Sequence, residues 1–225
     1  MSHHKAYSML GQKFLLSSDR ALYWDEQRLL IVADPHFGKA QTFREKGLAV
    51  PRGTTADDLK RLSALIKQFR PERLLILGDL VHDRIEHPAE INRMIDRWRG
   101  HHRDVQLILV RGNHDLGAGD PPAKFKIDQV ADELLIDPFI FTHQPEVDSS
   151  CYGIAGHLHP AVSLTGKGRS RETLPCFCFG PRIALLPAFG GFTGNQVIRP
   201  TIRDRIYVIA GNEVIKVPIA QPLSS

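Results

Sequence analysis

Three continuously apolar runs constrain the fold of this chain most strongly. They cover residues 28–33, 73–77 and 105–110 and read RLLIVA, RLLIL and VQLILV. Strands of this kind are typical of a parallel sheet whose two faces are both covered. Two segments with apolar residues at helix spacing, 59–69 and 91–98, lie between the runs. The first half of the chain therefore predicts a β-α-β-α-β order and an α/β fold.

The pattern changes after about residue 130. Short strand signals at 139–142, 183–186, 206–209 and 214–217 alternate with glycine-containing turns, and no long helical period appears among them. Two further strand signals, at 13–18 and 21–24, precede the first apolar run. We therefore expect a second, partly antiparallel sheet that packs against the first.

Length and composition favour one globular domain covering residues 1–225. The chain is 42% hydrophobic and 24% charged, which excludes a disordered, collagen-like or coiled-coil protein. No apolar run reaches the ~18 residues of a membrane span, and residues 1–10 lack the apolar core of a secretory signal. The sequence thus predicts a cytoplasmic protein with no membrane contact. The formal net charge of +4 allows an anionic partner without demonstrating one.

The chain contains three cysteines, an odd number that does not fit a disulfide framework. Cys176 and Cys178 stand two residues apart in an apolar stretch and are interpreted as reduced thiols in the core. A zinc site at this pair is the alternative, but no second pair of closely spaced cysteine or histidine residues lies nearby.

Aspartate, asparagine and histidine residues follow five of the strand signals at the point where each strand ends. Ligands of open α/β sheets gather at the carboxyl ends of the strands, so these side chains are expected to meet at one edge. Oxygen and imidazole groups that converge in this way indicate a metal site. The candidate ligands are Asp34, His36, Asp79, Asn113, His143, His157 and His159.

Seven ligands are too many for one tetrahedral ion and suit two ions that share a bridging carboxylate. Two ions about 3.5–4 Å apart form a clamp for in-line displacement at phosphorus, where they activate water and neutralise charge. Imidazole, carboxylate and amide ligands suit manganese, iron or zinc, and the absence of a thiolate from the set argues against copper or an iron–sulfur cluster.

Each motif alone has a simpler explanation. An Asp-x-His or Gly-Asp pair also occurs where an aspartate caps a helix, and His-x-His also occurs on a solvated strand. All five motifs in order, each after an apolar strand, are hard to explain by structure alone. His82 and His87 flank Asp83 after the second motif. We expect them at most to contact the ligands from outside and not to bind metal themselves.

The motifs DPH, GDLVHD, GNHD, the isolated His143 and GHLH together resemble the calcineurin-like metallophosphoesterase superfamily. The segments GKAQTFREKGLAVPRGTTADDLKRL, LPCF and LLPAFGGFTG further resemble the bacterial ligase-associated DNA damage response endonucleases, over about residues 28–217. The resemblance implies an α/β/β/α sandwich, in which two packed mixed sheets are flanked by helices. It also implies metal-dependent cleavage of DNA in repair, by an enzyme encoded near an ATP-dependent DNA ligase and a helicase.

The resemblance also assigns a role to each candidate residue. Manganese is the expected metal, with iron or zinc as alternatives. Asp34, His36 and His159 would hold the first ion, Asp79 would bridge, and the second ion would be held by Asn113, His143 and His157. His114 would act as general acid toward the leaving oxygen, and Asp115 would orient it.

Basic residues near the motifs are candidates for binding a polynucleotide backbone, although a charge run is commonly just a solvated face. Two of them stand in a predicted loop after the first motif, one precedes Asn113, and two follow the fifth motif: Lys39, Arg44, Arg111, Lys167 and Arg169. With the resemblance, they suggest single-stranded or unpaired DNA as substrate.

Two other functions share the same features. The metal machinery would equally serve a phosphomonoesterase, or a phosphodiesterase of small or lipid-linked nucleotides. A non-catalytic scaffold of the same fold is the third reading, which the complete set of ligands and the retained acid disfavour.

Overall fold

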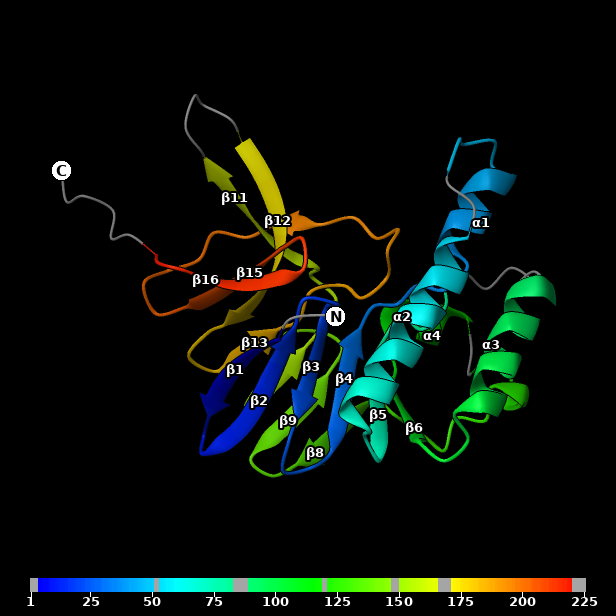
Figure 1. Ribbon diagram of the computed structural model, residues 1–225, viewed down its shortest axis with the longest axis horizontal. Helices are drawn as coiled ribbons and strands as arrows, with labels where there is room; N and C mark the ends of the chain where they lie inside the picture. Colours follow the sequence, from blue (N-terminus) through cyan, green and yellow to red (C-terminus); the bar gives the residue numbers. More distant parts are fainter. Residues whose placement is uncertain are drawn as a thin grey trace.

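Two β-sheets packed face to face form the centre of the computed structural model, which describes residues 4–50, 53–82, 89–118, 121–146, 150–165 and 171–219 (Figure 1). One sheet has seven strands and the other has nine. Buried aromatic and aliphatic side chains from both sheets fill the space between them, among them Trp24, Phe139, Phe141 and Phe177. Both sheets mix parallel and antiparallel neighbours, as expected.

The seven-stranded sheet follows chain order from edge to edge. Its first four strands form an antiparallel meander, and β4 to β7 are parallel. The strands are β1 (His4–Met9), β2 (Gln12–Ser17), β3 (Ala21–Trp24), β4 (Leu29–Ala33), β5 (Arg73–Leu77), β6 (Gln106–Val110) and β7 (Gln129–Ala131).

The nine-stranded sheet runs in the order β14-β11-β12-β13-β10-β9-β8, and β15 pairs with both β12 and β16. β9, β10 and β13 are parallel, whereas β12 is antiparallel to each of its partners. The strands are β8 (Glu133–Ile136), β9 (Phe139–Thr142), β10 (Tyr152–Ala155), β11 (Pro160–Thr165), β12 (Arg171–Phe179), β13 (Ile183–Leu185), β14 (Gln196–Val197), β15 (Arg205–Ala210) and β16 (Glu213–Val217).

The two long helices, α2 (Thr54–Phe69) and α3 (Ala89–His101), cover the outer face of the seven-stranded sheet (Figure 1). They bury apolar residues at helix spacing, including Leu59, Leu62, Ile91 and Ile95. The short helices are α1 (Lys39–Glu45), α4 (Asn113–Ala118) and the 3-10 turn η1 (Ala123–Phe125). None of the helices in the described residues is long and apolar enough to span a bilayer.

The continuous apolar runs are explained by the two covered faces of the seven-stranded sheet. Successive side chains of a strand point to opposite faces. On β4, Leu29, Ile31 and Ala33 enter the core between the sheets. Leu30 and Val32 enter the core beneath the helices. β5 and β6 alternate in the same way, so every position after their first residues, Arg73 and Gln106, is buried and none of these strands has a polar face.

The strands and long helices expected from the sequence are confirmed. The loop that the sequence predicts at Lys39 and Arg44 is wrong, because both residues lie in helix α1. This helix, with the sequence KAQTFRE, buries only Ala40, so it has no apolar periodicity by which it could be recognised.

Cys176 and Cys178 are buried in an apolar cluster, and burial raises the pKa of each thiol to about 12. They therefore remain protonated, as expected for core thiols.

The core between the sheets yields a stability prediction. Leu75 on β5 is fully buried there, so Leu75→Ala should lower the free energy of unfolding by about 2–5 kcal/mol through lost burial and the cavity left behind. Leu135→Ala on β8, where the side chain is 61% exposed, is the control and should change it by less than about 0.5 kcal/mol. Urea unfolding measures both. Equal effects would contradict the assignment of this core.

Candidate metal centre

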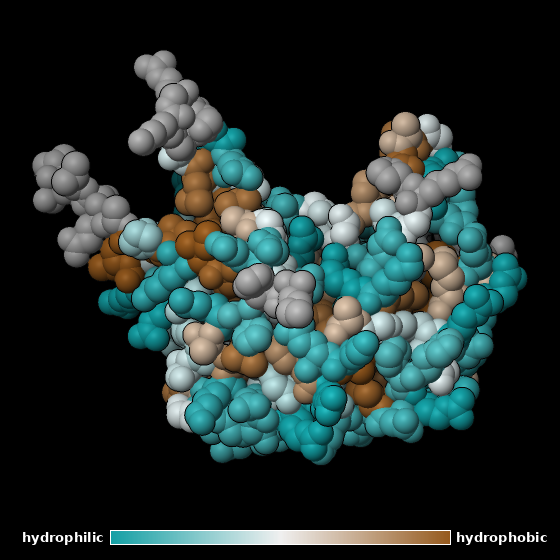
Figure 2. Space-filling view, in the orientation of Figure 1, coloured by the Kyte–Doolittle hydropathy of each residue, from teal (hydrophilic) through white to brown (hydrophobic). Residues whose placement is uncertain are grey.

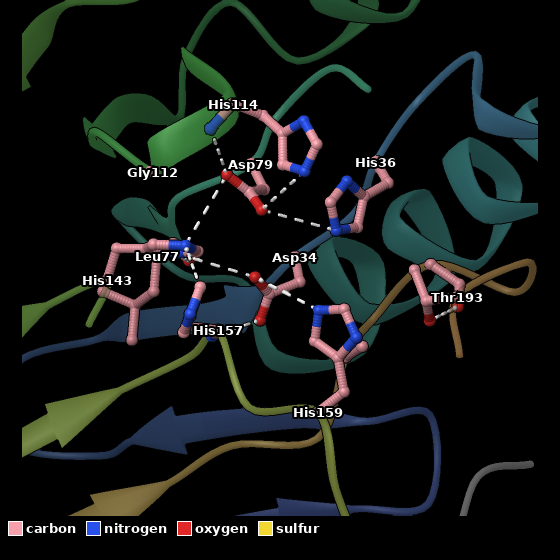
Figure 3. Close-up of polar contacts among 12 residues, drawn as sticks. Asp34, His36, Leu77, Asp79, Gly112, His114, His143, His157, His159 and Thr193 are labelled. Atoms are coloured by element: carbon pink, nitrogen blue, oxygen red, sulfur yellow. Dashed lines mark hydrogen bonds and ion pairs between the residues drawn. The ribbon is translucent and has the colours of Figure 1, made fainter. Parts of the chain in front are cut away.

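The predicted ligands meet where the parallel strands of both sheets end. The register pairs Ala33 of β4 with Leu77 of β5, and Leu77 with Val110 of β6, so these three strands end at the same level. The loops that follow are joined as well, because His36 N donates to the Asp79 carbonyl over 2.9 Å. In the other sheet, β9 and β10 end together with Thr142 beside Ala155. Figure 3 shows the resulting ring of imidazoles around two carboxylates.

The first group of ligand atoms surrounds Asp34. His159 Nε2 lies 3.5 Å from Asp34 Oδ1, and His36 Nε2 lies 3.5 Å from Asp79 Oδ2 (Figure 3). Ligand atoms of Asp34, His36 and His159 all lie within 4.8 Å of one another. Asp34 is fully buried and His36 is nearly so.

The second group gathers around His143. Its Nε2 lies 3.0 Å from Asn113 Oδ1, 3.0 Å from His157 Nδ1 and 3.6 Å from Asp79 Oδ1. One oxygen of Asp79 therefore faces the first group and the other faces the second. This arrangement is the one expected of a carboxylate that bridges two ions.

Hydrogen bonds leave the ligand atoms of two histidines available. His143 Nδ1 lies 3.2 Å from the Leu77 carbonyl, and His159 Nδ1 lies 3.0 Å from the Gly194 carbonyl. A carbonyl can only accept, so Nδ1 donates in both rings and Nε2 keeps its lone pair. Within the described residues, the buried atoms Asp34 Oδ1 and His159 Nε2 have no hydrogen-bond partner. Because buried polar atoms are normally paired, these atoms fit coordination of a cation.

Burial favours the neutral form of two of the imidazoles. Burial, followed by the positive charge of Lys39, lowers the pKa of His36 to about 2. Burial also lowers the pKa of His157, with the neighbouring His143 as the next contribution. A histidine binds a metal ion only in its neutral form, so both rings are prepared for coordination at neutral pH.

The backbone at this centre is strained. Among the described residues, ten other than glycine have positive φ, and five of them are candidate ligands. Left-handed conformations of this kind are unfavourable for residues with a Cβ and cluster at functional sites. The five are Asp34, His36, Asp79, His157 and His159, with φ between 46° and 65°.

Three glycines of the motifs allow the ligands to approach neighbouring backbone. A Cβ on Gly78 would lie 2.1 Å from His143 Nδ1, and one on Gly112 would lie 2.2 Å from Asp79 Oδ1. A Cβ on Gly156 would lie 2.6 Å from Asp34 Oδ2. Each glycine thus makes room for a ligand supplied by a different strand.

His114 and Asp115 start helix α4 but face different surroundings. The His114 side chain is 39% exposed, and its Nε2 lies 3.9 Å from Asp79 Oδ2. Asp115 was expected to orient this ring, and that expectation is wrong. Its buried carboxylate instead accepts hydrogen bonds from Gly112 N at 2.9 Å and Leu80 N at 3.1 Å. Asp115 therefore ties the loops after β5 and β6 together, and burial raises its pKa to about 6.

His82 lies closer to the centre than its sequence position suggested. Its ring centroid is 5.2 Å from that of His114 and 5.5 Å from that of His36. The three residues also form a group whose ligand atoms lie within 4.8 Å of one another. The only sequence signal was its place four residues after Gly78. His87 lies outside the described residues.

The basic residues chosen from the sequence occupy different places. Burial lowers the pKa of Lys39, and the negative charges of Asp79 and Asp34 offset part of this change. The ammonium group of Lys39 therefore lies close enough to the centre to interact with both carboxylates. Arg44 lines a cavity of about 500 Å³ between α1, α2 and α3. Arg111 forms an ion pair with Asp132 at 3.0 Å. Lys167 and Arg169 lie outside the described residues.

Known proteins share this fold and its motifs. The calcineurin-like phosphoesterase family matches residues 27–174 of the chain. The crystal structure of the nuclease MPE from Pseudomonas putida is similar with a TM-score of 0.83 and 34% sequence identity, over 96% of this chain and 100% of that one. The phosphoesterase Yfce from E. coli has 15% identity over 85% of this chain and 99% of its own, with a TM-score of only 0.40. No curated protein matches the chain.

The chain belongs to the calcineurin-like phosphoesterase family, because the family match covers more than half of its length. It is therefore a metallophosphoesterase, a hydrolase of phosphate esters from a family that depends on two metal ions. The solved structure most similar among those described above is that of a nuclease. The expected fold class and enzyme class are thus confirmed.

The close approach at Gly112 can be tested by adding one methyl group. In Gly112→Ala, the new Cβ would lie 2.2 Å from Asp79 Oδ1 and 2.4 Å from Asp79 N, so Asp79 must move. We expect a loss of about 10–100-fold in Mn²⁺ affinity or in hydrolysis of a nitrophenyl phosphodiester. Gly100→Ala in α3 is the matched control, because nothing lies within 4 Å of its Cβ, and it should keep full affinity. Normal metal binding by Gly112→Ala would contradict the packing described.

Proposed function

We propose that this protein is a DNA endonuclease that cuts single-stranded or unpaired DNA during DNA repair, with two divalent metal ions and manganese as the preferred one. The similarity to the P. putida nuclease MPE, over almost the whole of both chains, carries this proposal. The grouping of the seven candidate ligands into two sets that meet at Asp79 supports it. An enzyme that acts on chromosomal DNA would function in the cytoplasm. Its proposed functional partners are an ATP-dependent DNA ligase and a helicase.

The ligands divide into two sets in the proposed enzyme. Asp34, His36 and His159 would hold the first ion, Asn113, His143 and His157 would hold the second, and Asp79 would serve both. When bound, the ions supply Lewis-acid activation of water and neutralise charge on the phosphate. The chain holds their ligands rigid, because four of the seven are buried and the strands behind them are fully packed. The buried four are Asp34, His36, Asp79 and His143.

His114 is the proposed general acid. Its side chain is partly exposed, so a substrate can reach it, while Asp79 Oδ1 accepts a hydrogen bond from its backbone N at 3.0 Å. The backbone of His114 is therefore fixed relative to Asp79, and the ring Nε2 lies 3.9 Å from Asp79 Oδ2. In its protonated form it would give a proton to the oxygen that leaves the phosphorus, so that a hydroxyl departs instead of an alkoxide.

The shape of the molecule suits an extended strand. Figure 2 shows a hollow between two projections, which Figure 1 identifies as the β11–β12 hairpin and the region of α1. His159 stands directly before β11, and His36 and Lys39 stand at the start of α1. The candidate centre thus lies at the feet of both projections. A single strand that crosses the hollow would pass the centre, where Lys39 can pair with a phosphate.

The DNA proposal predicts that protein with Mn²⁺ will cut circular single-stranded DNA. Circular DNA has no ends, so its cleavage requires an endonuclease. Intact circular duplex should resist, because the rigid partner strand keeps its phosphates from the centre. Asp79→Asn is the control and should abolish cutting. Rapid hydrolysis of mononucleotides without cleavage of the circle would instead favour a phosphatase of small substrates.

The role of His114 predicts a dependence on the leaving group. His114→Ala should lose about 10²–10⁴-fold in DNA cleavage, the usual contribution of a positioned acid. Hydrolysis of bis-nitrophenyl phosphate should fall much less, because nitrophenolate leaves without a proton. Mn²⁺ stoichiometry, measured in parallel, should stay at the parental value. An equal loss on both substrates would show that His114 does not act as the acid.

A further inference from the structure

A loop of residues 188–194 packs against the first ligand group. Phe189 N donates to the Ala33 carbonyl at 2.7 Å, and Gly190 N donates to the Asp34 carbonyl at 3.2 Å. At its far end, the Gly194 carbonyl accepts the hydrogen bond from His159 Nδ1. The loop therefore touches two of the three residues that would hold the first ion, and it fixes which nitrogen of His159 is available.

The loop packs closely against the backbone of the first motif, residues 34–36. A Cβ on Gly190 would lie 2.4 Å from the Pro35 carbonyl and 2.9 Å from Thr193 Cγ2. Pro35 stands between the ligands Asp34 and His36, both of which have positive φ. Any displacement of the loop would therefore be passed on to these strained residues.

Three charged side chains hold the loop in place. Both carboxylate oxygens of Asp58 accept from Gly191 N, at 3.0 and 3.1 Å. Arg61 binds Asp58 Oδ1 at 2.9 Å, donates to the Phe189 carbonyl, and lies over the Phe189 ring. On the other side, Arg20 donates to the carbonyls of Ala188 and Gly190, both at 3.3 Å. The backbone of the loop is thus clamped by both its donors and its acceptors.

Burial of the Asp58 carboxylate is energetically unfavourable unless hydrogen bonds and an ion pair such as these compensate it. Its side chain is only 7% exposed, and burial raises the pKa of the carboxyl group. One turn earlier on α2, Thr55 Oγ1 accepts from Gly38 N at 3.0 Å. Residues three apart share one face of a helix. The same face of α2 therefore holds both backbone segments that flank the first ligand group.

We infer that Asp58, with Arg61 and Arg20, is a positioning residue that sets the affinity of the first metal site by clamping residues 188–194. None of the three is a candidate ligand, and they act through Asp34, His36 and His159. The inference rests on the ligand assignment of the proposed function, but it does not depend on DNA as the substrate. It predicts that loss of the clamp affects one metal site and spares the other.

Mn²⁺ binding to the full-length protein provides the test. Titration followed by electron paramagnetic resonance should resolve two sites in the parent. In Asp58→Ala, one site should weaken by about 10–100-fold, as is usual when the support of a metal ligand is removed, and the other should stay unchanged. Asp58→Asn keeps an oxygen that can accept from Gly191 N and should recover part of the affinity. Excess Mn²⁺ should restore hydrolysis of a nitrophenyl phosphodiester by Asp58→Ala.

Matched variants separate positioning from general destabilisation. Asp57→Ala, which removes an exposed carboxylate paired with Lys60 on the same helix, should bind both ions normally. Arg20→Met loosens the loop from its other side, so it should weaken the same site, and it serves if Asp58→Ala does not fold. Unchanged affinity at both sites, or an equal loss at both, would overturn the inference. If the parent binds two ions but does not cut DNA, the proposed substrate fails and the clamp stands.

Discussion

The Asp79 carboxylate is the contact on which the rest of the centre depends. Its side chain is nearly fully buried, and its two oxygens face different groups of histidines. Its backbone carbonyl binds the loop after β4, and one of its oxygens binds the backbone after β6. Asp34 and Asp79 are two buried carboxylates, and ligand atoms of both lie within 4.8 Å of each other and of His143. Burial of such charges is unfavourable without a counter-charge, so bound metal would also stabilise the folded protein.

The sequence was sufficient to predict the buried parallel strands β4, β5 and β6 and to single out candidate ligands, because both follow from short-range rules. Buried parallel strands read as apolar runs, and their carboxyl ends converge. Contacts that depend on side-chain direction were not predictable in this way. Asp115 follows His114 directly but turns inward, and α1 lacks an apolar stripe. Asp58 was missed for a related reason: a charged residue in a helix is expected at the surface, and only packing against residues 188–194 explains its burial.

Strain and close packing at the centre have a common origin. Five of the seven candidate ligands leave their strands in left-handed conformations, and Gly78, Gly112 and Gly156 let ligands approach the neighbouring strand. Conformations of this kind persist only where the surrounding structure determines them. Here the two fully packed cores, one on each face of the seven-stranded sheet, provide that support. The stability of the scaffold is therefore what keeps the geometry of the centre.

Strand β12 joins the outer projection to the interior of the protein. It begins at the exposed Arg171, pairs with β11 along the projection, and ends at the buried Phe179 between β13 and β15. His159 stands at the foot of the same hairpin, where its carbonyl accepts from Gln196 N. The foot is thus fixed by pairing on several sides, whereas the outer residues Arg171, Glu172 and Thr173 of β12 are exposed. In the proposed enzyme, a change in the length of β11 and β12 would alter how far the hairpin extends beside a substrate in the hollow, and His159 at its foot would keep its position.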